Sequence, residues 1–344
     1  MSRRGRRSGK PRSRARRLAL WGGLALILLL TAWGTAAEWY VHHPRRWFAE
    51  GRGGLPAAVA TPLEWFGNPL ADLTDGLGWT GHDAIYEYDV EAPAGSTLFA
   101  GAPARIRDPA PSDIQIVDKG EFVIGWSDRL RHPVWCAYHV VKEPKYNIST
   151  RPGFIKDRTL PEAPSPSAYA KSGYDRGHLA PNHAIASRYG PEAQRKTFTM
   201  SNVAPQTPAL NRGVWRDVEH RIADLWTARY GEIWVVVGAI SKMANGETIG
   251  GTGIDVPVAF YQVIIAQEGM NVRALAVVIP QVVRWNAWAA RYIVSIEELE
   301  GMTGLDFNPE LPGFIQRPLE AELPTRLWPV RLRDIFRLIR LWFT

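Results

Sequence analysis

The segment YDRGHLAPNHA, residues 174–184, places an acid, an arginine, a glycine and a histidine in a row. The segment has no apolar period, so core packing does not explain it. His178 has the side chain of a general base, because an unperturbed imidazole titrates at about pH 6.5. Arg176 can bind a phosphate through its planar fork of donors. The pair indicates chemistry on a phosphate ester.

A second candidate group lies on residues 211–231, NRGVWRDVEHRIADLWTARYG, whose apolar residues recur at helical spacing. Asn211 projects along the buried side of the predicted helix, and Glu219 lies two turns later at the margin of that side. Asn211 is either an N-cap or an oxygen ligand of a hard cation, with Glu219 holding the waters of that ion. A base, a phosphate clamp and a magnesium ligand are the parts that phosphodiester hydrolysis needs.

The elements that must position these residues follow from short apolar runs. Six segments rich in β-branched and aromatic residues predict strands: EFVIGWSD, VWCAYHVV, FTMSNVAP, EIWVVVGAI, AFYQVIIAQ and VRALAVVIP. Two helices are predicted among them, the segment at 211–231 and SIEELEGMTG, which opens with a Ser295–Glu298 capping box and closes at Gly304. We therefore expect an α+β fold around a mixed, largely antiparallel sheet.

The order and spacing of three motifs resemble the DNA/RNA non-specific endonucleases, the ββα-metal (His-Me finger) nucleases that include the sugar-non-specific nucleases and endonuclease G. The motifs are the Asp-Arg-Gly-His (DRGH) box, the later Ser-Asn-x-x-Pro-Gln, and an Asn-x3-Trp-x3-Glu helix. The resemblance covers residues 113–312.

The resemblance implies specific functions for four residues. His178 would be the general base that activates water, and Asn211 the direct protein ligand of a hydrated Mg²⁺, with Mn²⁺ as a substitute. Glu219 would position the water shell of the ion, and Arg176 would stabilise charge on the phosphate. The expected enzyme is a hydrolase that cleaves DNA and RNA with little sequence specificity and leaves 5′-phosphate products.

Further residues are assigned less directly. The family uses a second, upstream arginine, for which Arg151 is preferred over Arg158. Asn202 and Gln206 are expected behind the catalytic residues, and a structural turn is the alternative for Asn202. Asp175 is expected to cap or orient its loop rather than to bind metal.

Two histidines near these motifs are expected to take no part in the chemistry. His183 follows the helix-breaking Pro181, and His220 projects to the solvent side of the predicted helix.

The positive charge of the chain is concentrated at its amino terminus. Residues 1–17 carry nine basic and no acidic side chains, which leaves 32 basic and 34 acidic residues in the remainder. Residues 18–37 contain no charge and are long enough to cross a bilayer. The basic flank predicts a single-pass anchor with the catalytic domain on the non-cytoplasmic side. The alternative is a cleaved signal peptide and a secreted protein.

The predicted organisation is a basic tail (1–17), a transmembrane segment (18–41), a linker (42–112), the nuclease domain (113–312) and a C-terminal extension (313–344). The extension ends in a basic amphipathic helix, which either contacts a membrane surface or docks on its own domain. The single cysteine, Cys136, excludes an intrachain disulfide and a multi-cysteine zinc site.

Outside the basic tail the chain is nearly neutral, although a nucleic-acid substrate calls for positive charge. Local arginines, Arg188, Arg195 and Arg212, are expected to offset this. Three alternatives to the nuclease remain: a phosphodiesterase for another substrate, a membrane-anchored binding or scaffold protein on the same fold, and a nuclease toxin delivered to rivals. The sequence leaves open whether the protein forms a homodimer.

Overall fold

The computed structural model describes residues 95–330, apart from 149, 243–245, 270 and 325, together with residues 23, 86, 87 and 334. The chain divides into two compact units, 1–71 and 72–344, and the elements below belong to the second. The predicted membrane span, most of the linker and the amphipathic C-terminal helix lie outside the described residues. Within the described residues, no helix is both long and apolar enough to cross a membrane.

The main sheet is antiparallel throughout its described ladders. Its strands lie in the order β1 (Tyr86–Glu87), β10 (Asn271–Pro280), β9 (Ala259–Glu268), β8 (Ile233–Ile240), β5 (His132–Val140), β4 (Phe122–Ser127) and β3 (Ile114–Asp118), with β11 (Ile293–Val294) paired to β10. Most connections join sequence neighbours, as expected for strands that need no crossover helix. The sequence-based expectation of a largely antiparallel sheet is confirmed.

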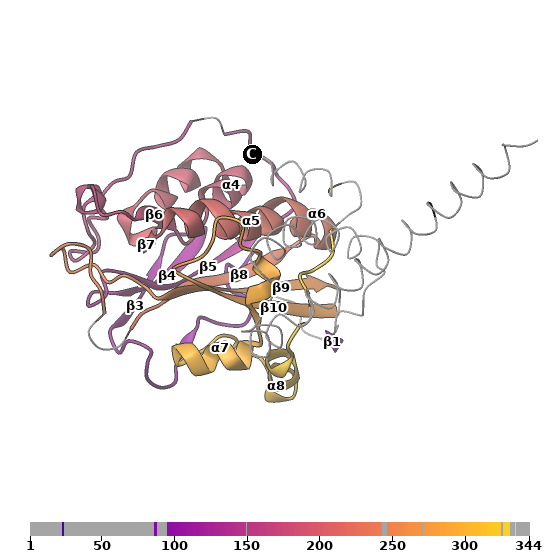
Figure 1. Cartoon of the computed structure of the whole chain (residues 1–344). Coiled ribbons are helices and arrows are strands. Elements are labelled where there is room, and N and C mark those ends of the chain that lie inside the picture. The colour runs from indigo at the N-terminus through magenta and orange to yellow at the C-terminus, as the bar shows by residue number, and fades with distance from the viewer. Residues whose placement is uncertain are drawn as a thin grey trace, which may run out of the picture. The chain divides into compact units, whose positions relative to one another are not determined.

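Helices cover both faces of this sheet (Figure 1). On strand β9 the side chains alternate between the two faces, as the pleat requires. Phe260 packs edge-on against Trp215 on one face, and Tyr261 packs edge-on against Phe307 on the other, with ring centroids 5.7 and 5.3 Å apart. The first face carries α4 (Asn182–Thr197) and the helix that contains Trp215, and the second carries α7 (Ile296–Thr303) and α8 (Gly313–Ala321).

A separate two-stranded ladder carries the DRGH box. Strand β6 (Asp175–His178) pairs antiparallel with β7 (Val203–Gln206), so that His178 lies opposite Val203. A long helix follows β7 and consists of η3 (Leu210–Val214), α5 (Trp215–His220), η4 (Arg221–Trp226) and α6 (Thr227–Tyr230). The two strands and this helix form a β-β-α unit on one face of the main sheet. The remaining short elements are the β2 (Ala104–Arg105) and β12 (Leu305–Asp306) pair and the 3₁₀ turns η1 (Pro166–Tyr169), η2 (Met200–Asn202) and η5 (Ala289–Tyr292).

Helix α4 was not predicted, because Pro181 was interpreted as a helix breaker. Pro181 stands at the N-cap, outside the helical turns, where a proline removes no hydrogen bond. Pro191 follows Gly190, whose φ of 87° breaks the helix into two pieces. The predicted strand FTMSNVAP is also wrong in part, because its middle residues form the turn η2 and only the end of the segment pairs as β7.

The predicted ends of α7 are confirmed. The Ser295 side chain accepts a hydrogen bond from the backbone N–H of Glu298, and Gly304 closes the helix with a φ of 71°. Cys136 is buried in β5, and burial raises the pKa of its thiol. It packs in the buried core of the sheet.

Candidate functional site

One pocket of about 580 Å³ brings the sequence-predicted residues together. Its walls come from β6, the start of α4, the η3–α5 helix, and the loop before β6 that holds Arg151 and Phe154. The residues that line it include Arg151, Arg176, His178, Asn211 and Glu219. His178 and Asn211 are 33 positions apart in the sequence and line the same cavity because β6 pairs with β7 directly before the helix begins. The β-β-α unit is therefore what assembles the site.

His178 stands between two phenylalanines. Its ring centroid is 5.0 Å from that of Phe154 and 4.8 Å from that of Phe198. Its Nε2 is enclosed and has no hydrogen-bond partner among the described residues. Burial, and next the positive charge of Arg151, lower the pKa of His178 to about 3. The imidazole is therefore neutral at physiological pH and can accept a proton.

The two predicted arginines lie on either side of this aromatic pair. The Arg176 guanidinium donates to the carbonyl oxygen of Pro166 at 3.2 and 2.8 Å and lies 5.4 Å from the Phe154 ring centroid. The Arg151 guanidinium lies 5.4 Å from the Phe198 ring centroid. Arg151 lines the pocket and Arg158 does not, which agrees with the preference for Arg151.

Asn211 is oriented by the first residue of the DRGH box. Its Nδ2 donates to the carboxylate of Asp175 at 3.0 Å, and Arg212 holds the same carboxylate with two hydrogen bonds of 2.8 and 2.5 Å. Burial works to raise the pKa of Asp175, but these donors outweigh it and lower the pKa. The amide oxygen of Asn211 accepts no hydrogen bond from the described residues, so it is available to the pocket. The N-cap interpretation of Asn211 is not supported, because η3 has no side-chain cap.

Glu219 lies two turns after Asn211 and lines the same pocket. Burial raises the pKa of its carboxyl to about 8, against a smaller lowering by the Trp215 indole. A carboxyl with a raised pKa in a polar pocket is typical of a functional group. A nearby positive charge would return it to the ionised form.

Asn202 and Gln206 are fully buried behind the pocket. The Asn202 amide accepts from Ala180 N at 2.8 Å and donates to the carbonyl oxygens of Ala180 and Thr197 at 3.0 Å each. Asn202 thus fixes the turn that follows His178, in line with the structural alternative for this residue. The Gln206 side chain lies against Gly177, where a Cβ would be only 2.2 Å from the Gln206 oxygen. A side chain at this position of the box would therefore have to displace Gln206.

Two histidines share one carboxylate at the edge of the site. His183 Nε2 and His220 Nδ1 lie 2.8 and 3.1 Å from the same oxygen of Asp224. His183 is 62% exposed and lines the pocket, whereas the His220 side chain is only 22% exposed. The predicted solvent-facing position of His220 is wrong, because the π-helical turn η3 shifts later residues away from the regular helical spacing.

The charge of the site comes partly from residues that the motifs did not indicate. Arg216 lines the pocket and, among the described residues, has no hydrogen-bond or ion-pair partner. The signal for it was available, because Arg212, Arg216 and Glu219 follow the i, i+4, i+7 spacing of one helix face. Arg188, expected to offset the neutral charge of the domain, is instead buried and donates to the carbonyl oxygens of Val141 and Ala223.

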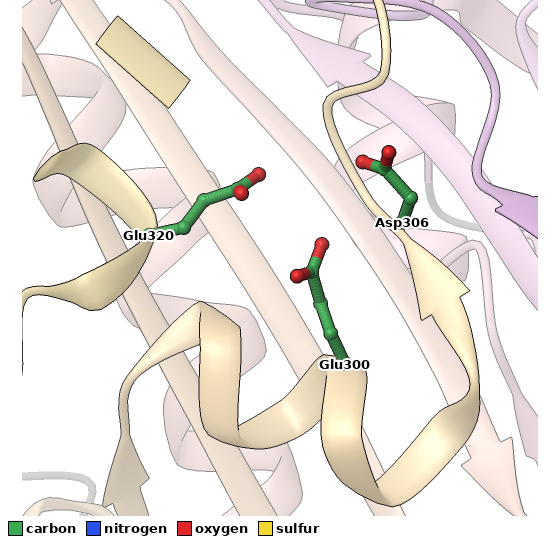
Figure 2. A group of neighbouring side chains, drawn as sticks. All are labelled: Glu300, Asp306 and Glu320. Carbon is green, nitrogen blue, oxygen red and sulfur yellow. The ribbon is translucent and has the colours of Figure 1, made fainter. Parts of the chain in front are cut away.

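One other group of described residues could hold a metal ion on distance alone. The carboxylates of Glu300, Asp306 and Glu320 converge within 4.8 Å of one another at the junction of α7, β12 and α8 (Figure 2). Each already accepts a hydrogen bond: from Phe307 N at 3.1 Å, from Gln316 at 2.8 Å and from Asn308 at 3.0 Å, respectively. Burial raises the pKa of Glu300 and of Glu320 to about 7, so these carboxyl groups are partly protonated near neutral pH.

Comparison with known proteins agrees with the geometry. Residues 103–314 match the family model described as DNA/RNA non-specific endonuclease. A nuclease of Nostoc sp. is 30% identical over 223 residues, which cover 61% of this chain and 79% of the relative. The mitochondrial endonuclease G of Bos taurus is 28% identical over 64% of this chain and 80% of its own length. The mitochondrial nuclease EXOG of Xenopus laevis is 32% identical over 55% of this chain, and the match spans about half of that relative, 56%.

A solved structure shows the same architecture. The crystal structure of the EndoG/EndoGI complex superposes with a TM-score of 0.53 at 25% sequence identity and covers 57% of this chain and 86% of the solved chain.

Proposed function

Because the chain belongs to the DNA/RNA non-specific endonuclease family and is a hydrolase of the nuclease class, we propose that its pocket cleaves phosphodiester bonds of DNA and RNA with little sequence preference. The observation that carries the proposal is the meeting of His178 and Asn211 in one cavity, with Arg151 and Arg176 on its walls. A neutral base, an oriented amide oxygen and two guanidinium groups around one space suit a phosphodiester.

His178 is proposed to take the proton of the attacking water. Its Nε2 is enclosed, so we infer that Nδ1 is the nitrogen that faces water. The low pKa keeps the ring unprotonated before substrate arrives. A bound phosphodiester would bring a negative charge that offsets Arg151 and raises the pKa of His178, which strengthens the base when it is needed.

The donor set fits a hard divalent cation. Asn211 offers an amide oxygen with its nitrogen end held by Asp175, and Glu219 offers a carboxylate from the same helix. Magnesium prefers oxygen ligands and keeps several of its waters, so one direct ligand and one water-holding carboxylate suffice. A cation bound there supplies positive charge for the developing charge on the phosphate and the leaving oxygen. Mg²⁺, with Mn²⁺ as a substitute, is our proposal for the ion.

The arginines are proposed to bind the phosphate itself. Arg176 is held by its two hydrogen bonds to Pro166, which leaves its remaining N–H groups for the pocket. Arg151 approaches from the side of Phe198. Fixed guanidinium groups need no reorganisation as charge develops, which is the condition for electrostatic catalysis. Attack by water on the side of His178 and departure of the 3′ oxygen leave a 5′-phosphate.

The test is cleavage of supercoiled plasmid, single-stranded DNA and RNA by the purified full-length chain. We expect all three to be cut with Mg²⁺ or Mn²⁺, EDTA to abolish cutting, and Asn211→Ala to remove it while the protein stays folded. Failure to cut any of them with either ion would contradict the proposal, as would cutting that EDTA leaves unchanged.

A further inference from the structure

Trp285 is a large aromatic side chain that the fold leaves 63% exposed. It lies in the segment that follows β10, in which Val282 is 83% exposed and Arg284 is also exposed. A tryptophan buries more apolar surface than almost any other residue, so leaving it in water forgoes a large stabilisation. A single exposed apolar residue is common on protein surfaces. Whether Trp285 has a binding function therefore depends on where it lies relative to the pocket.

The segment is fixed to the catalytic β-β-α unit at its base. Buried Gln281 accepts from Thr207 N at 3.0 Å and donates to the carbonyl oxygen of Pro205 at 2.8 Å. The Thr207 hydroxyl also donates to the Gln281 carbonyl oxygen at 2.6 Å. Pro205 lies within β7, the strand that pairs with the DRGH box. The base of the segment is therefore held in a constant position relative to the pocket.

The tip of the segment is a tight turn beside the metal-ligand helix. Ala287 N donates to the Arg284 carbonyl oxygen at 3.0 Å, which places Trp285 at the corner of the turn. A Cβ added to Gly213 would lie 3.4 Å from the Trp285 carbonyl oxygen, so the two backbones approach closely. Gly213 is two residues after Asn211. Trp285 is thus beside the helix segment that supplies Asn211 and Arg212 to the pocket, and outside the pocket lining itself.

The charges on this helix segment and on the turn are positive. Arg212 and Arg216 line the pocket on the helix side of Gly213, and Arg284 adjoins Trp285 on the turn. Among the described residues, Arg216 and Arg284 have no carboxylate partner. An exposed aromatic ring in a segment beside guanidinium groups that have no carboxylate partner suits a single nucleic-acid strand, the ring stacking on a base and the arginines contacting phosphates.

We propose that Trp285 stacks on a base of the substrate strand next to the scissile phosphate, with Arg284 contacting the adjoining phosphate. The inference rests on the proposed nuclease function, because it needs a nucleic acid in the pocket. Stacking is available to any base, so it agrees with cleavage that is insensitive to sequence. Bases in a duplex are already stacked, so Trp285 favours single-stranded and frayed substrates over intact duplex.

The experiment measures kcat/KM of the full-length chain on a short single-stranded DNA and on the same strand with abasic sites. We expect Trp285→Ala to lower kcat/KM on the normal strand about 5- to 150-fold, mainly through KM. Trp285→Phe should retain most of the activity, and all three proteins should act equally on the abasic strand. The matched control is Phe314→Ala, which removes an 80% exposed aromatic from α8 on the other face of the sheet and should change nothing.

Two results would overturn the stacking proposal while leaving the nuclease intact. One is unchanged kcat/KM of Trp285→Ala on the normal strand. The other is an equal loss on both strands or a changed oligomeric state of Trp285→Ala, which would assign Trp285 to the fold or to self-association. A wild-type chain that cuts neither strand would instead refute the proposed function itself.

Discussion

The amide nitrogen of Asn211 donates a hydrogen bond of 3.0 Å to the carboxylate of Asp175, across 36 positions of sequence. An amide has two ends, and this bond decides which of them faces the pocket. The acid at the head of the DRGH box thereby presents the Asn211 oxygen, and Arg212 holds that acid in place. The box and the helix are coupled through this contact.

Asp175→Ala should weaken metal binding by about 10- to 100-fold, because the amide of Asn211 loses the partner that orients it. The measurement is the Mg²⁺ concentration that gives half-maximal cleavage. Excess Mg²⁺ should restore part of the rate. Asp118→Ala, which removes an exposed turn carboxylate, is the control and should leave the Mg²⁺ requirement unchanged. An unaltered requirement in Asp175→Ala would show that Asn211 does not depend on this contact.

Alanine substitution of the two motif asparagines, Asn202 and Asn211, should have different effects: the first should mainly lower stability and the second should mainly remove cleavage. Asn202→Ala leaves buried backbone groups of Ala180 and Thr197 unpaired, so it should lower the free energy of unfolding by about 1–3 kcal/mol. Asn211→Ala removes one partly exposed hydrogen bond and should cost about 1 kcal/mol or less, while abolishing cleavage. Urea unfolding and plasmid cleavage of both variants check the pair. Equal effects on stability would contradict these assignments.

Gly177→Ala should destabilise the β6–β7 ladder. The new methyl group would be 2.2 Å from the oxygen of the buried Gln206 side chain, which cannot move to solvent, and overpacking of this kind costs about 1–3 kcal/mol. Gly153→Ala is the control, because nothing lies within 4 Å of its Cβ position. A second change, Gln206→Ala, should recover part of the loss in Gly177→Ala. Additive losses in the double variant would refute the steric explanation.

The acidic junction of α7, β12 and α8 should make stability fall as the pH rises. The pKa of Glu320 is about 7 in the fold against 4.5 in its ordinary state, so the folded chain holds more protons than the unfolded chain between these values. The contribution is full below pH 4.5 and is lost as the pH rises through about 7, with a slope of at most about 1.4 kcal/mol per pH unit. Glu320→Gln should remove the part of the pH dependence of unfolding free energy that comes from this carboxyl. Glu192→Gln, at an exposed position of α4 away from this junction, should leave the pH slope unchanged. Identical pH profiles of Glu320→Gln and wild type would contradict the raised pKa.

The residues of the candidate site could be located from sequence because polar residues in a non-periodic segment stand out against an apolar background. His178 and Arg176 belong to a box with no packing explanation, and Asn211 and Glu219 share a predicted helix. The contact between Asp175 and Asn211 could not be foreseen, because it depends on the register of β6 against β7. No local pattern encodes that register.

The features that were predicted wrongly or missed also depend on backbone geometry and packing that local sequence patterns do not show. Helix α4 was missed because a proline at an N-cap looks the same in sequence as a proline that breaks a helix. His220 was placed toward solvent because a π-helical turn cannot be seen in apolar spacing. Trp285 lies in a turn after β10, where an aromatic residue gives no sign of whether its ring packs inward or remains exposed.

The most direct test of the account is single-turnover cleavage of one defined oligonucleotide by His178→Ala, with and without added imidazole. The account predicts a rate at least about 100-fold below wild type at saturating Mg²⁺, with partial recovery when imidazole replaces the missing base. Metal binding should be unchanged, because Asn211 and Asp175 are untouched. Cleavage by His178→Ala at the wild-type rate would show that this imidazole does not activate the water.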